Sequence, residues 1–123
     1  MAEYLIDTNI YIAILKGDVK LKYLVESLTG ALDAVVYIEL IQGAKNKGEV
    51  QTIEKYLTRF DLIHFSETIS KKSIELIRTY SKSHGLLLGD AIIAATCLEK
   101  DLTLITLNVK DFRFIKSLKI LKP

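Results

Sequence analysis

The feature that most constrains the fold of this chain is an alternation of short apolar runs with longer segments of helical periodicity. The apolar runs predict strands at residues 3–6, 34–38, 62–65 and 102–106, with a short last strand at 120–121. The periodic segments predict helices at residues 10–16, 19–28, 50–60, 66–84 and 89–100, and the second strand is expected to turn into a helix near Glu39. Strands separated by helices predict an α/β fold with a mostly parallel central sheet covered by helices on both faces.

Length and hydrophobicity indicate one compact domain spanning residues 1–123. The chain has 123 residues and is 50% hydrophobic, which is enough for one core and too little for two ordinary domains. No apolar run approaches the roughly 20 residues that span a bilayer. The first residues lack the cationic start and apolar stretch of a signal peptide. We therefore expect a soluble, cytoplasmic protein without a membrane partner.

The cysteine and histidine content narrows the kinds of metal site that the chain can build. Cys97 is the single cysteine, so an internal disulfide and a multi-cysteine zinc site are excluded. His64 and His84 stand in unrelated contexts, without another histidine or cysteine at ligand spacing. Any metal would have to be held by oxygen atoms.

Charge is distributed unevenly along the chain. Residues 1–70 carry 7 Lys/Arg against 10 Asp/Glu, whereas residues 71–123 carry 10 against 5. Basic residues gather close to the end of the chain, where they offer a phosphate-contacting edge: Lys110, Arg113, Lys116, Lys119 and Lys122. A solvated, lysine-rich surface is the alternative, and charge alone favours it.

Three aspartates stand where ligands bind in parallel sheets, beyond the carboxyl ends of strands. Asp7 directly follows the first strand, Asp90 follows the run at 86–89, and Asp111 comes shortly after the strand that ends at Thr106. Each also has a structural explanation. Asp7 and Asp90 are suitable N-caps of helices, and Asp111 suits a turn.

Glu39 is harder to explain structurally, because it interrupts the apolar run at 35–41 and no pairing lysine or arginine is apparent nearby in the sequence. A carboxylate buried in an apolar run is costly unless something pairs with it. If Asp7, Glu39, Asp90 and Asp111 converge, the like charges raise one another's pKa unless a cation neutralises them. Carboxylate ligands with spare water positions suit Mg²⁺ or Mn²⁺.

Further polar side chains are expected at the same edge of the sheet. Thr8, Asn9, Thr106 and Asn108 carry hydroxyl or amide groups that can orient carboxylates, a metal-bound water or a phosphate oxygen. Taken singly, each also fits a cap or a turn. Their grouping favours a supporting role around the acids.

Four segments with acids and small residues follow one another across nearly the whole chain: LIDTN at 5–9, ELIQGA at 39–44, GDAIIAA at 89–95 and LITLNVKDF at 104–112. They resemble the successive motifs of PIN-domain proteins and are most similar to those of the VapC toxins of toxin-antitoxin modules. The resemblance implies a three-layer fold in which Asp7, Glu39, Asp90 and Asp111 hold one or two Mg²⁺ or Mn²⁺ ions and form the catalytic site of an endoribonuclease. In that family a metal-activated water cuts the phosphodiester to leave a 5′-phosphate and a 3′-hydroxyl.

The chain departs from this family pattern at two places. Many relatives carry a serine or threonine shortly before the glutamate, where this chain has Val36, Tyr37 and Ile38. Many also carry an arginine between the threonine and the asparagine of the last motif, where this chain has Leu107. Both changes concern phosphate positioning, and neither removes an expected metal ligand.

The resemblance also implies partners, namely an RNA substrate, a VapB-like antitoxin and a second copy of the chain in a homodimer. The helices expected at 10–16, 19–28 and 50–60 are richer in large apolar residues than one short sheet requires. Surplus apolar surface of this kind is typical of an interface. The alternative is that all of it is core.

Two other functions remain open from the sequence. A PIN-like module that binds nucleic acid with a partner, without nuclease activity, would keep the fold, but retention of all four acids argues against it. A phospho-receiver domain has a similar length and class. It would need adjacent acids after the first strand and a lysine after a late strand, where this chain has Asp7-Thr8-Asn9 and Leu107-Asn108.

Overall fold

The computed structural model describes residues 2–123, which form five strands, six α-helices and one 3₁₀ helix. In chain order the elements are β1 (Tyr4–Ile6), α1 (Thr8–Leu15), α2 (Val19–Glu26), β2 (Gly30–Asp33), α3 (Ala34–Gln42), α4 (Lys47–Leu57), β3 (Asp61–Ile63), α5 (Glu67–His84), α6 (Leu88–Lys100), β4 (Thr103–Ile105), η1 (Val109–Asp111) and β5 (Ile120–Leu121).

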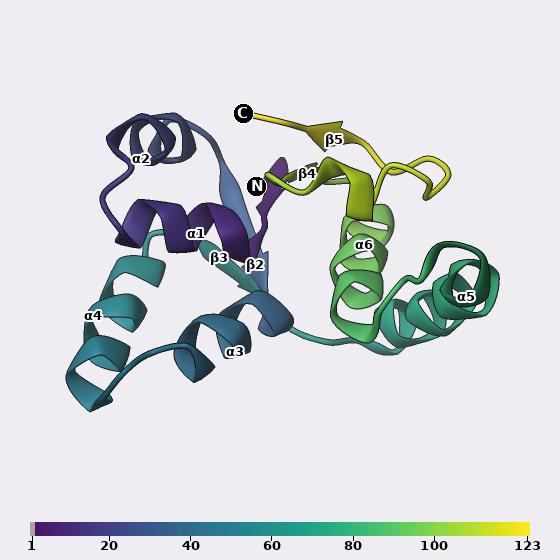
Figure 1. Cartoon of the computed structure of the whole chain (residues 1–123), viewed down its shortest axis with the longest axis horizontal. Helices are drawn as coiled ribbons and strands as arrows, with labels where there is room; N and C mark the ends of the chain where they lie inside the picture. The colour runs from purple at the N-terminus through teal and green to yellow at the C-terminus, as the bar shows by residue number, and fades with distance from the viewer. Residues whose placement is uncertain (1) are drawn as a thin grey trace.

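The strands form one sheet in the order β3-β2-β1-β4-β5, and every neighbouring pair is parallel. Helices α1 to α4 lie on one side of the sheet, and α5 and α6 lie on the other (Figure 1). The chain changes sides after β3, because the connection to β4 passes back over β2 and β1. The predicted α/β fold with a parallel sheet between two helical layers is confirmed.

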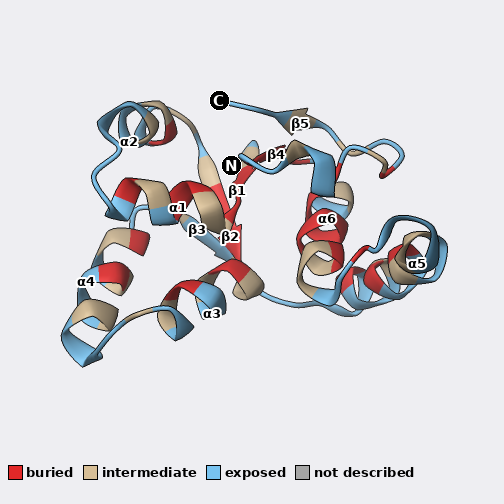
Figure 2. Cartoon of the chain, in the orientation of Figure 1, coloured by how far each residue is buried: buried red, intermediate tan, exposed pale blue. Residues whose placement is uncertain are grey.

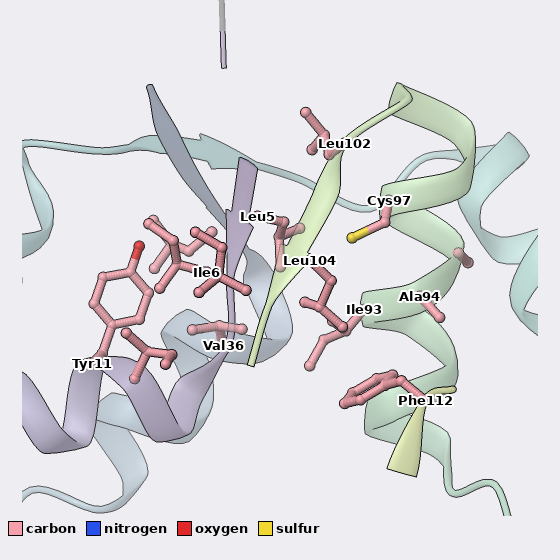
Figure 3. Close-up of a cluster of buried hydrophobic side chains, with 14 of the residues drawn as sticks. Leu5, Ile6, Tyr11, Val36, Ile93, Ala94, Cys97, Leu102, Leu104 and Phe112 are labelled. Atoms are coloured by element: carbon pink, nitrogen blue, oxygen red, sulfur yellow. The ribbon is translucent and has the colours of Figure 1, made fainter. Parts of the chain in front are cut away.

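The core fills both interfaces between the sheet and its helices. On β1, Leu5 points toward α6 together with Leu104 of β4, whereas Ile6 points to the opposite face (Figure 3). This alternation is the period of two that a strand imposes on its side chains. The middle of helix α6 is buried (Figure 2), and the thiol of Cys97 lies inside the core. Burying each large side chain stabilises the fold by about 1.5–3 kcal/mol.

Polar side chains fix where several helices begin. At each of the four helices α2 to α5, one side chain accepts a hydrogen bond from a backbone N–H of the first turn, which satisfies one otherwise unpaired donor. Helix α5 ends at Gly85, whose φ of 71° lies in the left-handed region that glycine adopts without strain. The capping residues are Asp18 for α2, Asp33 for α3, Asn46 for α4 and Ser66 for α5.

The predicted strand at 34–38 is wrong, because these residues form the first half of α3. The strand is β2, four residues earlier, and the Oδ1 atom of Asp33 caps α3 by accepting from the amide of Val36 at 2.9 Å. The β-branched valines suggested a strand, but the cap stabilises a helix. Gly30 begins β2. A Cβ atom there would lie 2.5 Å from the Cδ1 atom of Ile6 on β1, so any larger residue would require the side chain of Ile6 to shift.

Other boundaries differ by a few residues. The second helix ends at Glu26 instead of residue 28, and the third strand covers Asp61–Ile63 instead of 62–65. Phe60 lies beyond the end of α4, where its ring packs edge-on against Tyr11 with the centroids 5.2 Å apart. Within residues 2–123, the helices are all too short or too polar to cross a membrane.

Candidate active site

The candidate site lies where the three central strands end. Asp7 follows β1, Asp33 is the last residue of β2, and Thr106 follows β4. Because β1 and β4 pair in register, with Ile6 opposite Ile105, the residues after them are neighbours. The amide of Asp7 donates to the carbonyl of Ile105 at 3.0 Å and extends this pairing to the edge of the sheet.

Asp7 is buried and held by three hydrogen bonds. The hydroxyl of Thr106 donates to its Oδ2 atom at 2.8 Å, the amide of Thr8 donates to Oδ1 at 2.8 Å, and the side-chain amide of Asn9 donates to Oδ2 at 3.3 Å. Burial raises the pKa of Asp7 above its ordinary value, and the charge of Glu39 acts in the same direction, while the hydrogen bonds oppose the rise. The carboxylate is therefore fixed in position but short of compensating positive charge.

The structure brings all four predicted supporting residues to this edge. The hydroxyl of Thr106 accepts from the side-chain amide of Asn9 at 3.3 Å and from the backbone amide of Asn108 at 3.0 Å. The Oδ1 atom of Asn9 accepts from the amide of Leu107 at 3.2 Å. Thr8 uses its hydroxyl to bond Glu39. The network ties the start of α1 to the segment after β4, so the position of Asp7 depends on both.

Glu39 lies on α3 at the rim of the site. Its Oε1 atom accepts from the hydroxyl of Thr8 at 2.6 Å. It also lies close to the start of α6, because a Cβ atom on Gly89 would be 3.9 Å from its Oε2 atom. The side chain is exposed, so the expectation of a carboxylate buried in an apolar run is wrong. Because the segment is helical, Val36 and Leu40 face the core, whereas Ile38 and Glu39 face outward.

Asp90 occupies the first turn of α6 and is only partly exposed. Burial raises its pKa to about 6, and the charges of Asp7, Asp111 and Glu39 add to the rise. Asp111 is the last residue of η1 and is exposed. Asp90 is therefore close enough to all three of the other predicted acids for their charges to raise its pKa, although they lie in different parts of the chain.

The cap and turn explanations that the sequence left open for three of the acids do not all hold in the structure. Asp7 does cap α1, so its capping role coexists with its place in the cluster. Asp90 is not a cap, because it is the third residue of α6 and Leu87 occupies the N-cap position without a side-chain hydrogen bond. Asp111 closes a single 3₁₀ turn, as the predicted turn required.

Asp33 is a fifth acid at this edge, and the sequence analysis missed it. It is 1% exposed, and burial raises its pKa to about 6, with the charges of Asp7 and Glu39 adding to the effect. The hydroxyl of Thr96 on α6 donates to its Oδ2 atom at 3.5 Å. The sequence does carry a signal for Asp33, because an acid directly follows the short run Gly30–Leu32, as Asp7 follows its own apolar run. The predicted strand at 34–38 starts four residues later than β2, so this signal was not used.

Carboxylate charge at this edge is not balanced by protein cations. Within residues 2–123, none of the five acids forms an ion pair with a lysine or arginine. The donors are oxygen atoms only, which suits a hard divalent cation. No three histidine, cysteine or acidic side chains of the described chain are already arranged around one ion position. The residues thus fit such a cation in charge and donor chemistry, and binding would require their side chains to draw together.

Comparison with known proteins agrees with this architecture. The family model described as "PIN domain" matches residues 4–116. The chain belongs to the PIN domain family. Among curated relatives of this PIN domain, Ribonuclease VapC10 of Mycobacterium tuberculosis is 34% identical over 120 residues, which cover 94% of this chain and 90% of that protein. The predicted resemblance to VapC proteins is confirmed.

Solved structures extend the similarity to three dimensions. A toxin-antitoxin complex from Klebsiella pneumoniae contains a chain with a TM-score of 0.83 and 34% identity, covering 98% of this PIN domain and 97% of that chain. VapBC2 from Rickettsia felis, bound to a DNA fragment from its promoter, matches with a TM-score of 0.78 and 29% identity over 96% of both chains. Both neighbours are similar over their whole length, so the match covers the candidate site and every layer of the fold.

Proposed function

We propose that this PIN domain is a metal-dependent endoribonuclease and acts as the toxin of a toxin-antitoxin module. The observation that carries the proposal is the convergence of Asp7, Glu39, Asp90 and Asp111 at one edge of the sheet, with the pKa of Asp7 and Asp90 raised. Holding like charges together costs stability, and a catalytic site is a common reason for such a cost. The ribonuclease relatives and the toxin-antitoxin neighbours support the same function.

Asp7, Glu39, Asp90 and Asp111 are the residues that would hold Mg²⁺ or Mn²⁺. When bound, such an ion supplies a nucleophilic water at neutral pH and stabilises charge on the phosphate. The protein's own contribution is positioning. Thr106 and Asn9 fix the Oδ2 atom of Asp7, and Thr8 fixes Glu39, so ligands from two helices keep their orientation before substrate binds.

A groove beside Glu39 is the proposed binding site of the antitoxin. It has a volume of about 770 Å³ and lies between α1, α3 and α4. Its lining combines apolar side chains with two acids, Glu39 and Glu49, and two lysines, Lys16 and Lys45. An amphipathic segment whose basic side chain meets Glu39 fits such a mixed groove. Such a segment would place its cation against the acids and block the site. The groove is lined by Ile12, Leu15, Lys16, Glu39, Leu40, Gly43, Lys45, Asn46, Glu49, Thr52 and Ile53.

Cleavage by the purified protein and two variants tests this function. Asp7→Asn and Asp90→Asn should each reduce Mg²⁺-dependent RNA cleavage by about 100-fold or more, while the fold stays intact because the ionised carboxylates are a burden without a cation. Cleavage would be followed by gel electrophoresis of a labelled RNA, and folding by circular dichroism. Wild-type turnover in either variant would contradict the site, and a wild-type protein without activity would favour the binding-module alternative.

A further inference from the structure

Basic residues alternate with buried anchors in the segment that runs from η1 toward β5. Helix η1 ends at Asp111, and the amides of Phe112 and Arg113 both donate to the carbonyl of Val109, at 3.0 and 2.9 Å, so the chain turns directly after it. Phe112 and Ile115 are 1% and 4% exposed and anchor the segment in the core. Lys110, Arg113 and Lys116 are exposed and alternate with these anchors along the segment, and we call these three residues the basic edge.

The three side chains of the basic edge are exposed and lack carboxylate partners in the described part of the chain. Lys119, in the same segment, is paired and lies 2.9 Å from Asp101. Arg78 and Lys82, near the end of α5 that the segment contacts, also form no ion pair in the described structure. An exposed cation without a partner keeps its full attraction for an anion from solution.

The basic edge is next to the candidate site. Lys110 directly precedes Asp111 and Arg113 follows two residues later, and the charge of Asp111 acts on Asp90. Electrostatic interactions are screened over about 8–10 Å at physiological ionic strength, so the edge and the acids act on the same stretch of a bound polyanion. A cleft of carboxylates repels the phosphates on either side of the one being cut, and neighbouring cations offset that repulsion.

Aromatic rings from α5 hold the basic edge and extend it. The hydroxyl of Tyr80 accepts from the backbone amide of Lys116 at 3.1 Å, and the ring of Phe114 lies 5.3 Å from that of Tyr80. The exposed ring of His84 stacks on Phe114 with centroids 4.5 Å apart. Figure 1 shows the loop after η1 beside α5, on the opposite side of the sheet from α2 and α4. Cations next to exposed rings are typical of surfaces that bind single-stranded nucleic acid.

We propose that Lys110, Arg113 and Lys116 bind the phosphates of single-stranded RNA flanking the bond that is cut. This role rests on the proposed nuclease function and assigns the substrate a path across the α6 side of the site. The contacts carry no sequence information by themselves, because they address the backbone. They raise affinity and orient the strand relative to Asp90 and Asp111.

Salt-dependent binding of a labelled, unstructured RNA oligonucleotide tests the basic edge, measured by fluorescence anisotropy in EDTA so that cleavage does not occur. The variant Lys110→Ala/Arg113→Ala/Lys116→Ala should lower affinity on the order of 100-fold near 0.1 M salt and reduce the log–log salt slope by about 2, since each phosphate contact on a single strand contributes about 0.7. The matched control is Lys20→Ala/Lys22→Ala/Lys55→Ala. It removes three exposed lysines of α2 and α4, across the sheet, that also lack ion pairs in the described structure.

The control variant should bind RNA with nearly the wild-type slope. Equal losses in the two variants, an unchanged slope in the edge variant, or no measurable binding by the wild type would each overturn the proposal. Tighter wild-type binding to duplex DNA of the same length would also overturn it, in favour of a DNA surface. Cleavage with Mg²⁺ is measured separately. If the wild type binds RNA through the basic edge but does not cleave it, only the proposed nuclease function is contradicted. If the wild type cleaves RNA and the edge variant binds it normally, only the role of the basic edge is contradicted.

Discussion

The hydroxyl of Thr106 donates a hydrogen bond to the Oδ2 atom of Asp7 over 2.8 Å, although 99 positions separate the two residues in the chain. The bond joins the ends of the two central strands β1 and β4. It is fully buried, since Thr106 is 0% exposed and Asp7 is 6% exposed. The orientation of the candidate ligand at the end of β1 thus depends on a side chain that follows the last central strand.

Thr106→Val should weaken both the fold and metal binding. Valine keeps the shape of the side chain but leaves the Oδ2 atom of Asp7 without its shortest hydrogen bond. We expect a loss of about 1–3 kcal/mol in the free energy of unfolding, measured by urea denaturation, and weaker Mn²⁺ binding by calorimetry. Thr106→Ser keeps the hydroxyl and is the matched control. If the serine variant lost Mn²⁺ affinity as strongly as the valine variant, packing would explain the effect and the hydrogen bond would not.

Stability without metal should increase as the pH falls from about 7 to about 5. Asp33 and Asp90 have a folded-state pKa of about 6, above the ordinary value of 3.8. Within this window the folded state binds more protons than the unfolded state, so protonation favours folding. The free energy of unfolding, measured in EDTA by urea denaturation, should be larger near pH 5 than near pH 7. A flat or opposite profile would mean that the acids are compensated in the folded protein.

Asp33→Asn separates the contribution of the buried Asp33 to this pH dependence from that of Asp90. Asparagine caps a helix about as well as aspartate, so the start of α3 should be preserved. The variant should be more stable than the wild type at pH 7, by an amount on the order of 2 kcal/mol, and its pH dependence should be smaller. Asp18→Asn is the control, because Asp18 caps α2 on the exposed surface. The prediction fails if both substitutions change the pH profile equally.

Glu39→Gln should weaken Mn²⁺ binding while leaving the fold nearly unchanged. Glu39 is exposed, and its hydrogen bond with Thr8 can be kept by the carbonyl oxygen of glutamine. Losing one carboxylate removes a charged ligand without opening a cavity. Titration calorimetry measures the affinity, and thermal unfolding in EDTA measures the stability. Unchanged Mn²⁺ affinity together with a large loss of stability would identify Glu39 as a structural residue and remove it from the site.

The sequence predicted the fold and the positions of the acids better than their environments. Asp7 and Thr106 were found because clean apolar runs precede them, and a parallel sheet brings such strand ends to one edge. Asp33 was missed because the valines of α3 have strand propensity, and this propensity obscured the local N-cap that Asp33 forms three residues before Val36. Glu39 was identified because it was expected to be buried, but it is exposed. The direction of its side chain depends on whether the segment is helical, which the apolar run alone does not show. The ion pair between Lys119 and Asp101 could not be predicted from the sequence either, because the two residues come together only where β4 pairs with β5.

The remaining prediction concerns self-association. Besides the groove beside Glu39, an apolar hollow of about 490 Å³ lies between α5 and α6, outside the helices whose apolar residues predicted an interface. Large apolar side chains at its rim remain in water, with Phe65 54% exposed, Ile74 55% and Leu88 70%. A monomer gains nothing from this exposure, whereas a second copy of the chain would cover it.

We therefore expect a homodimer at micromolar concentration, with α5 and α6 at the interface, and light scattering should give twice the mass of 13.9 kDa. Ile74→Lys should shift the protein to monomers, because a charge would be buried without a partner at the interface. Val19→Lys is the matched control, since Val19 is 74% exposed on α2, on the opposite side of the sheet. A monomeric wild type would contradict the dimer. A dimer that Ile74→Lys leaves intact, but Val19→Lys disrupts, would move the interface to the α2 side.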